Sequence, residues 1–289
     1  MRQLIGYGQP IESDFPVHGA LLSAGVERRA RGITIRRLAE VTNLGRADLI
    51  YQLTDDGLVF SPPGVAHYRC SASQITITPQ AGADRDEITD LLVATALPAV
   101  LWLQARLVLH AAGAVLPGSD RAIAIAGPSG VGKSTVVAQL VAHGACLIGD
   151  DTMSISTDGE ILSVSGLPGG YFLPRAADGT RNFRDLPRSQ SIVSSEIGAI
   201  LVLEQMPQDH SSIETLDPLG AIEQLLANQH RPRIPALLGQ QGEVVRICAV
   251  IATRVPVMRW RRRQGQAELD RHEREALMET IELGSRKHD

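Results

Sequence analysis

Residues 127–135, with the sequence GPSGVGKST, constrain the fold of this chain more than any other stretch. Their spacing fits the pattern G-x-x-x-x-G-K-[S/T], in which a glycine-rich loop joins a strand to a helix. The apolar run at 121–126 predicts the strand, and the run at 134–143, followed by Gly144, predicts the helix. The sequence therefore predicts an α/β domain built around this phosphate loop.

The residue types of the loop suit nucleotide phosphates, although a glycine-rich turn without a ligand is the alternative. Glycines let backbone N–H groups turn toward phosphate oxygens, and the helix N-terminus adds positive potential. We expect Lys133 to reach the β- and γ-phosphates and the Ser134 hydroxyl to ligate Mg2+, which makes ATP and Mg2+ the predicted cofactors. The predicted nucleotide-binding residues are Gly127, Ser129, Gly130, Val131, Gly132, Lys133, Ser134 and Thr135.

Charge and cysteine usage narrow the environment of the chain. A net charge of -4 over 289 residues gives no general attraction to nucleic acid or to an anionic membrane, so we predict neither as a partner. Cys70, Cys146 and Cys248 contain no C-x-x-C pair, which is typical of a reducing cytoplasm. We therefore expect a cytoplasmic protein, and the sequence leaves open whether it forms a homo-oligomer.

The chain divides into three predicted parts: a small β-rich N-terminal domain at 1–83, a connecting and packing helix at 84–106 with a kink at Pro98, and a phosphate-loop kinase domain at 107–289. No catalytic group is expected in the first part. Strands are predicted there at 33–36, 49–53, 58–60, 66–70 and 74–78, with a turn at 55–57. In the last part we predict strands at 107–116, 145–149, 197–204 and 244–253, and helices at 219–229 and 267–283.

Two adjacent acids follow the apolar strand predicted after the loop helix. Carboxylates at this position of a phosphate-loop enzyme face Mg2+ and the γ-phosphate, so Asp150 and Asp151 are a candidate catalytic pair rather than a simple polar strand end. On an extended backbone they would point to opposite sides, one toward the metal and the other toward the acceptor. His110 lies in the strand predicted beside the loop strand, where a buried structural histidine is the alternative.

These residues resemble a known family. The stretches LHAAGAV (109–115), AIAIAGPSGVGKST (122–135) and GACLIGDD (144–151) are similar to the catalytic core of the HPr kinase/phosphorylase family. The resemblance implies that Asp150 is the general base toward a serine hydroxyl and that Asp151 helps to hold Mg2+. It also implies that His110 acts near the phosphate, beside the catalytic Lys133. The two acids can exchange roles as far as the sequence shows.

The signature that recognises HPr in that family is absent. The comparable place reads SVSGLPGGYFLPR (163–175), and NQHRPR follows at 228–233. Both segments resemble the HPr-kinase-related enzymes that phosphorylate lasso-type precursor peptides. Arg175, Arg231 and Arg233 are therefore the predicted substrate-binding residues, with solvated loop arginines as the alternative for the last two. A basic run at 259–263 is typical of a solvated strand end, and RNA contact is its less favoured interpretation.

The predicted function is transfer of the γ-phosphate of ATP to a Ser or Thr hydroxyl of a peptide or protein, such as a lasso-type precursor peptide. The alternatives are a small-molecule kinase that takes free serine, an HPr serine kinase, and a switch ATPase. A catalytically weak scaffold is the remaining one. The chain has neither the Leu-Ser-Gly-Gly-Gln signature of transporter ATPases nor the Asn-Lys-x-Asp motif of GTPases.

Overall fold

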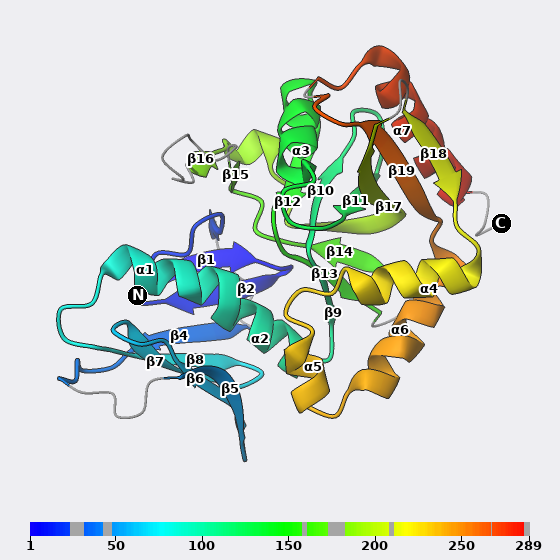
Figure 1. Cartoon of the computed structure of the whole chain (residues 1–289). Helices are drawn as coiled ribbons and strands as arrows, with labels where there is room; N and C mark the ends of the chain where they lie inside the picture. The colour runs from blue at the N-terminus through cyan, green and yellow to red at the C-terminus, as the bar shows by residue number, and fades with distance from the viewer. Residues whose placement is uncertain are drawn as a thin grey trace.

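The structure, a computed structural model, describes residues 1–23, 32–42, 48–157, 161–172, 183–207, 211–266 and 268–285. Within these residues the chain is mixed α/β, with an eight-stranded sheet, a nine-stranded sheet and a two-stranded one. The eight-stranded N-terminal sheet lies at the lower left of Figure 1, and the nine-stranded sheet that carries the phosphate loop lies above it and to the right. None of the described helices is long and apolar enough to cross a membrane.

The N-terminal sheet has the strand order β3-β1-β2-β4-β8-β7-β6-β5. Its strands are β1 Arg2–Gly6, β2 Gln9–Ser13, β3 Leu21–Leu22, β4 Ile33–Arg37, β5 Asp48–Thr54, β6 Gly57–Ser61, β7 Ala66–Cys70 and β8 Gln74–Pro79. The five predicted strands are confirmed as β4 to β8, and Thr54 pairs with Gly57 across the predicted turn. The sequence analysis missed β1, β2 and β3.

A long helix crosses from the N-terminal sheet to the second sheet (Figure 1). It consists of α1 Arg85–Leu91, a π-helical segment η1 Leu92–Ala96 and α2 Leu97–Leu103, and the Asp84 side chain caps it by accepting from the Asp86 N–H. The predicted irregularity is a wide π turn just before Pro98. Proline has no N–H to donate to the carbonyl four residues earlier, so the helix accommodates it by a local change of winding.

The second sheet has the order β12-β10-β11-β17-β14-β13-β9, with β19 beside β17 and β18 beside β19. Its strands are β9 Leu107–Leu109, β10 Ala111–Val115, β11 Arg121–Ala126, β12 Cys146–Gly149, β13 Met153–Ser156, β14 Ser163–Ser165, β17 Ser194–Met206, β18 Ser212–Thr215 and β19 Val257–Arg263; β15 Gly170–Phe172 and β16 Phe183–Asp185 form the two-stranded sheet. The prediction of one strand over 107–116 was wrong, because the chain changes partners at His110: β9 pairs with β13, whereas β10 pairs with β11 and β12.

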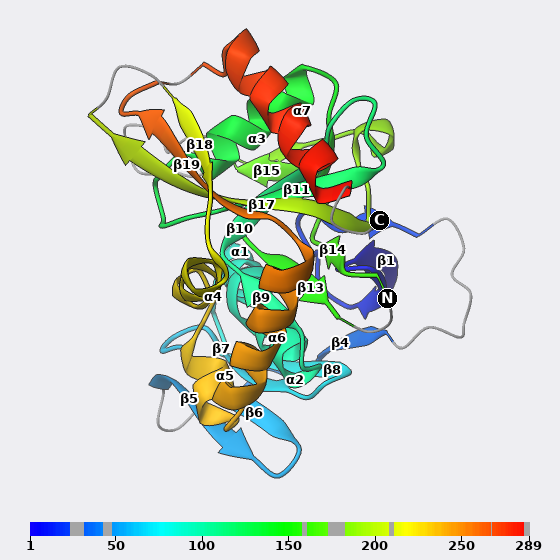
Figure 2. The same cartoon turned by 90° about the vertical axis from the view of Figure 1, so that its right-hand side faces the viewer.

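Helices cover both faces of this sheet, as Figure 2 shows for α7 above it and α6 below it. The helices are α3 Lys133–Ala142, α4 Pro218–Ala227, α5 Arg233–Leu237, α6 Gln241–Arg254 and α7 Arg271–Ser285, with a 3-10 turn η2 at Arg188–Gln190. The strand predicted at 244–253 was wrong, since these residues belong to α6. Its buried positions, Val244, Ile247, Cys248, Ile251 and Ala252, have helical spacing, and the apolar run between them masked that period.

One apolar core joins the two large sheets. It runs from Phe60 and Ile77 of the N-terminal sheet through Leu97 of α2 to Val108 and Met153 of the second sheet. A separate core under α3 and α7 fills the opposite face. The N-terminal sheet and the second sheet thus share one apolar core through α2, while the exact division at 83 and 106 stays a prediction.

Candidate functional site

The predicted phosphate loop lies between β11 and α3, as its pattern requires. Three of its glycines have positive φ: Gly127 at 150°, Gly130 at 82° and Gly132 at 102°. At Gly127 an added Cβ would lie 2.9 Å from the Leu203 carbonyl oxygen, so a larger residue would push the loop off β17. Gly132 is the N-cap of α3, and the helix begins with Lys133. The glycines therefore allow the turn that aims backbone N–H groups into the loop.

The Lys133 side chain bonds back to the first two residues of the loop. Its ammonium donates to the Gly127 carbonyl at 2.8 Å and to the Pro128 carbonyl at 2.9 Å, and the residue is only 5% exposed. A buried ammonium held by neutral carbonyl oxygens is well placed to exchange them for phosphate oxygens, which also supply the opposite charge.

Ser134 and Asp150, two predicted site residues from different elements, are in contact. The Ser134 hydroxyl donates to the Asp150 carboxylate at 2.8 Å. The same carboxylate accepts from the Asp151 N–H at 3.0 Å and from the Phe172 N–H at 2.9 Å, which fixes its orientation. This pair of oxygen ligands, one hydroxyl and one carboxylate, suits Mg2+, which takes few protein ligands and completes its shell with phosphates and water. Accordingly, the described residues contain no group of three or more His, Cys, Asp or Glu that would hold a metal without a nucleotide.

Asp151 does not follow the extended geometry expected of it. Its φ is 74°, in the left-handed region, so the two acids are not simply displayed on opposite sides of a strand end. The reason is that β12 ends at Gly149 and the chain turns at once into β13. Asp151 lies within electrostatic range of Tyr7 and of His230, and its charge acts to raise the pKa of both side chains.

His110 lies at the same edge as the phosphate loop. It directly precedes Ala111, which pairs with Ala126, the last residue before the loop. The His110 ring is edge-on to that of His230, with the ring centroids 5.7 Å apart. The backbone N–H of His110 donates to the Asn228 carbonyl at 2.8 Å. The break between β9 and β10 therefore brings a predicted site residue against the segment 228–230.

The structure adds a site residue from the N-terminal part, where none was expected. Tyr7 lies in the β1–β2 turn with a φ of 51° and is 1% exposed. Its N–H donates to the Gly166 carbonyl at 2.7 Å, and Arg106 donates to its carbonyl at 2.8 Å. Its hydroxyl hydrogen-bonds to Thr152, and burial, together with the charge of Asp151, raises its pKa. No sequence motif indicated Tyr7 as a site residue, because its place in the site depends on packing between the two sheets.

His230 completes what we call the buried polar cluster, which consists of Tyr7, Thr152 and His230. The Thr152 hydroxyl lies 3.1 Å from the imidazole Nδ1, and the Trp102 indole donates to the His230 carbonyl at 2.8 Å. Burial lowers the pKa of His230 to about 4, so its ring is neutral near pH 7. The only sequence signal was its presence in the segment 228–233.

The arginines predicted to bind substrate are placed differently from one another. Arg231, with a φ of 58°, donates to the Ala94 carbonyl at 2.9 Å and to the Thr95 hydroxyl at 3.0 Å. It thereby supplies the donor that Pro98 lacks and ties the segment 228–233 to the π turn, which is a structural task that the prediction missed. Arg233 is exposed at the start of α5, and Arg175 lies outside the described residues.

The remaining loop residues and the basic run have clear surroundings. Ser129 and Gly130 are exposed, the Val131 carbonyl accepts from Gln205 at 3.0 Å, and Thr135 is half-buried on α3. Three arginines of the basic run have acidic partners: Arg259 with Glu204, Arg261 with Glu204 and Glu214, and Arg262 with Glu273. The solvated strand-end role of this run and the absence of RNA contact stay predictions.

Comparison with known proteins gives little beyond this geometry. No protein-family model matches the chain, and no curated protein matches it. Among solved structures, the Hpr(Ser) kinase/phosphatase from Coxiella burnetii is similar over 62% of this chain and 95% of that protein, with 17% identity and a TM-score of 0.34. Identity and TM-score are both too low for this likeness to assign a family or an activity.

Proposed function

We propose that the chain is an ATP-dependent kinase that transfers the γ-phosphate to a Ser or Thr hydroxyl of a peptide or protein. The observation that carries the proposal is the 2.8 Å contact between Ser134 of the phosphate loop and Asp150 at the end of β12. A loop that merely turns has no use for a carboxylate aimed at its hydroxyl, whereas a Mg2+–nucleotide site needs both. Bound there, Mg2+ would neutralise charge on the β- and γ-phosphates.

The contacts support one of the two distributions of roles between the acids. Both carboxylate oxygens of Asp150 accept hydrogen bonds from the protein, and one of them accepts from Ser134, the other expected metal ligand. We therefore assign Asp150 to the metal with Ser134. Asp151, the next residue along the chain and within electrostatic range of the buried polar cluster, is the general base that takes the proton of the acceptor hydroxyl. This is the exchange of roles relative to the assignment that the family resemblance implies.

The segment 166–172 supports a peptide as the acceptor. Gly166 packs against Gly149, where an added Cβ on either would lie 2.9 Å from the other residue's Cα, and the Phe172 N–H holds Asp150. This segment thus runs beside Asp150, at the place where the signature that recognises HPr is absent from the sequence. An extended peptide offers backbone groups to such a segment, and Arg233 is exposed nearby in sequence to the histidine of the cluster.

The test presents three acceptors in parallel with labelled ATP and Mg2+: a precursor-type peptide bearing Ser and Thr, HPr, and free serine. We expect label on the peptide, located by mass spectrometry to a hydroxyl residue. Asp151→Asn is the matched control, because it should abolish labelling while keeping nucleotide binding. Label on free serine or HPr alone would replace the peptide by that acceptor. Phosphate release without any labelled acceptor would favour the ATPase alternative.

A further inference from the structure

Two adjoining cavities lie beside the phosphate loop. The first, of about 270 Å³, is lined by the loop residues Gly130, Val131, Gly132 and Thr135 and by Gln205, Arg262, Arg263, Gly265 and Gln266. The second, of about 760 Å³, shares Arg263, Gly265 and Gln266 with the first. Arg263 is the last residue of β19, and Gly265 and Gln266 belong to the loop between β19 and α7, so the two cavities adjoin along this connection.

The orientation of a bound nucleotide follows from the loop. Lys133 and Ser134 mark the end that holds the β- and γ-phosphates, because the ammonium and the metal ligand act there. Thr135 and the backbone of Gly130 and Gly132 line the cavity at the other end, where the α-phosphate and the nucleoside leave the loop. The two adjoining cavities therefore lie where the nucleoside of a bound nucleotide must lie.

Sheet topology leads to the same place. β11 is parallel to β17, and β17 is parallel to β19, so the carboxyl ends of these three strands lie at one edge of the sheet. The phosphate loop follows β11, and the loop 264–270 follows β19. Ligands of such sheets bind beyond the carboxyl ends of the strands.

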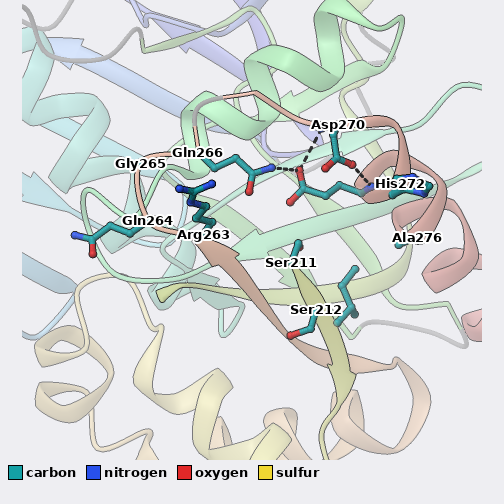
Figure 3. Close-up of a pocket in the computed structure, with 11 residues that line it drawn as sticks. Ser211, Ser212, Arg263, Gln264, Gly265, Gln266, Asp270, His272 and Ala276 are labelled. Atoms are coloured by element: carbon teal, nitrogen blue, oxygen red, sulfur yellow. Dashed lines mark hydrogen bonds between the residues drawn. The ribbon is translucent and has the colours of Figure 1, made fainter. Parts of the chain in front are cut away.

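The lining chemistry suits a base and a ribose. Figure 3 shows Arg263 and Gln266 on one side of the larger cavity, Asp270 and His272 on the other, and Ser211 and Ser212 at the start of β18 between them. Guanidinium and amide groups can stack on a base or bond to its edge, and hydroxyl and carboxylate oxygens can bond to ribose hydroxyls. A volume of about 760 Å³ falls within the usual range for small-molecule sites, roughly 300–1,000 Å³.

A buried ion pair holds this loop in shape. Arg262 donates to both carboxylate oxygens of Glu273, at 2.8 and 2.9 Å, and the two side chains are 6% and 3% exposed. Glu273 also accepts from the Gln266 amide at 3.0 Å and from the Asp270 N–H at 3.2 Å, which Figure 3 marks with dashed lines. A loop fixed in this way is preorganised, so little entropy is lost when a ligand binds it.

We propose that the end of β19 and the loop from β19 to α7 form the nucleoside subsite of the nucleotide whose phosphates the loop 127–135 holds. Arg263 is the main residue that contacts the nucleoside. This subsite rests on the proposed function, because it assumes a nucleotide in the phosphate loop. It assigns a role to the arginine of the basic run that lacks an acidic partner among the ion pairs described above.

The experiment compares ATP with inorganic tripolyphosphate, which has the same phosphate chain but no nucleoside. Binding of both, with Mg2+, is measured by calorimetry on the full chain and on Arg263→Ala, Arg263→Lys and Lys133→Ala. Arg246→Ala is the matched control, since Arg246 is an exposed arginine of α6, whose residues pack in the core on the other face of the sheet. We expect Arg263→Ala and Arg263→Lys to weaken ATP about tenfold and to leave tripolyphosphate unchanged, because a lysine keeps the charge but not the planar group. Lys133→Ala should weaken both ligands.

Two results would overturn the subsite while leaving the kinase in place. One is equal weakening of ATP and tripolyphosphate by Arg263→Ala with rescue by Arg263→Lys, which would make Arg263 a phosphate contact. The other is unchanged ATP affinity in both variants. A wild-type chain that binds neither ligand would instead remove the proposed function and the subsite together.

Discussion

The two flanks of Asp151 are assembled by different means. On one flank Lys133, Ser134 and Asp150 come from one strand–loop–helix–strand unit, and Ser134 and Asp150 remain half-buried, open to a ligand. On the other flank the buried polar cluster draws Tyr7 from the first hairpin of the chain and His230 from the end of α4 and the turn after it. Its three members are at most 9% exposed. The first flank can touch a nucleotide, whereas the second can act only by holding other groups in position.

This difference gives the N-terminal sheet a place in the function. The hydrogen bonds of the Tyr7 backbone to Gly166 and Arg106 fix the β1–β2 turn against the segment that precedes Phe172. The Phe172 N–H in turn donates to the Asp150 carboxylate. A β-rich extension that was expected to carry no site residue therefore contacts the segment whose Phe172 N–H holds Asp150. Mutations of Lys133, Ser134 or Asp150, which form the motif flank, should abolish nucleotide binding or phosphate transfer. Mutations in the buried polar cluster should only lower the rate of transfer.

The largest effect is expected from Lys133→Ala. Loss of the ammonium removes the charge that faces the β- and γ-phosphates, so ATP affinity should fall about 10²-fold or more. Calorimetric titration with ATP and Mg2+ measures this. Lys133→Arg should not restore binding, because a guanidinium cannot make the same two close contacts to Gly127 and Pro128. Unchanged affinity together with unchanged turnover would refute the phosphate site.

The two acids should separate binding from transfer. Asp151→Asn should retain Mg2+–ATP affinity within about twofold and lose about 10²–10⁴-fold in phosphate transfer, which is the usual contribution of a positioned base. Asp150→Asn should raise the Mg2+ concentration needed for ATP binding, because the carboxylate beside Ser134 is lost. Metal titrations and single-turnover transfer measure the two effects. The reverse pattern would return the base to Asp150, as the family resemblance implies.

Much of the fold and of the motif flank followed from local sequence. Strands β4 to β8, the loop strand β11, the helix α3 and the helix α7 were predicted because their apolar periods and turn residues are encoded within a few positions. The apolar run of α6 was assigned to the wrong class, since a helix buried along one whole side looks like a buried strand when the residues between the core positions are also apolar. The π turn arose from Pro98, a residue whose position was noted but whose consequence depends on Arg231.

The buried polar cluster was beyond local inference. Tyr7 reaches Thr152 only because the β1–β2 turn contacts Gly166 just after β14, and His230 reaches it only because Leu109 forms a β-bridge with Gln229. These contacts join residues that are far apart in the chain, and nothing in their spacing reveals them. For the same reason Arg231 could not be told from a substrate ligand: its partners lie in a helix that precedes it by more than a hundred residues.

The cluster itself is tested by Tyr7→Phe. This change removes the hydroxyl beside Thr152 and should lower phosphate transfer about tenfold, as outer partners of a site typically do, while costing about 1 kcal/mol of unfolding free energy. Tyr68→Phe is the matched control, because the Tyr68 hydroxyl is also buried and donates to the Ile88 carbonyl of α1 at 2.8 Å. It should cost similar stability without changing transfer. Equal effects of both variants on transfer would make Tyr7 purely structural.

The smallest effect, and the one most specific to the cluster, is the pH dependence of stability. His230 has a pKa of about 4 in the folded chain against its ordinary 6.5, because burial and the charges of Arg231 and Lys133 outweigh Asp151. Below pH 6.5 the histidine is protonated in the unfolded chain but stays neutral in the folded chain. The free energy of unfolding should therefore fall as the pH drops from 6.5 toward 4, by at most about 1.4 kcal/mol per pH unit. Denaturant unfolding at pH 7.5 and pH 5 measures this slope. His230→Gln keeps a polar partner for Thr152 and should flatten the slope, whereas the exposed control His143→Gln should keep it. If the slope is the same with and without His230, the ring is protonated in the folded chain and the cluster is not neutral.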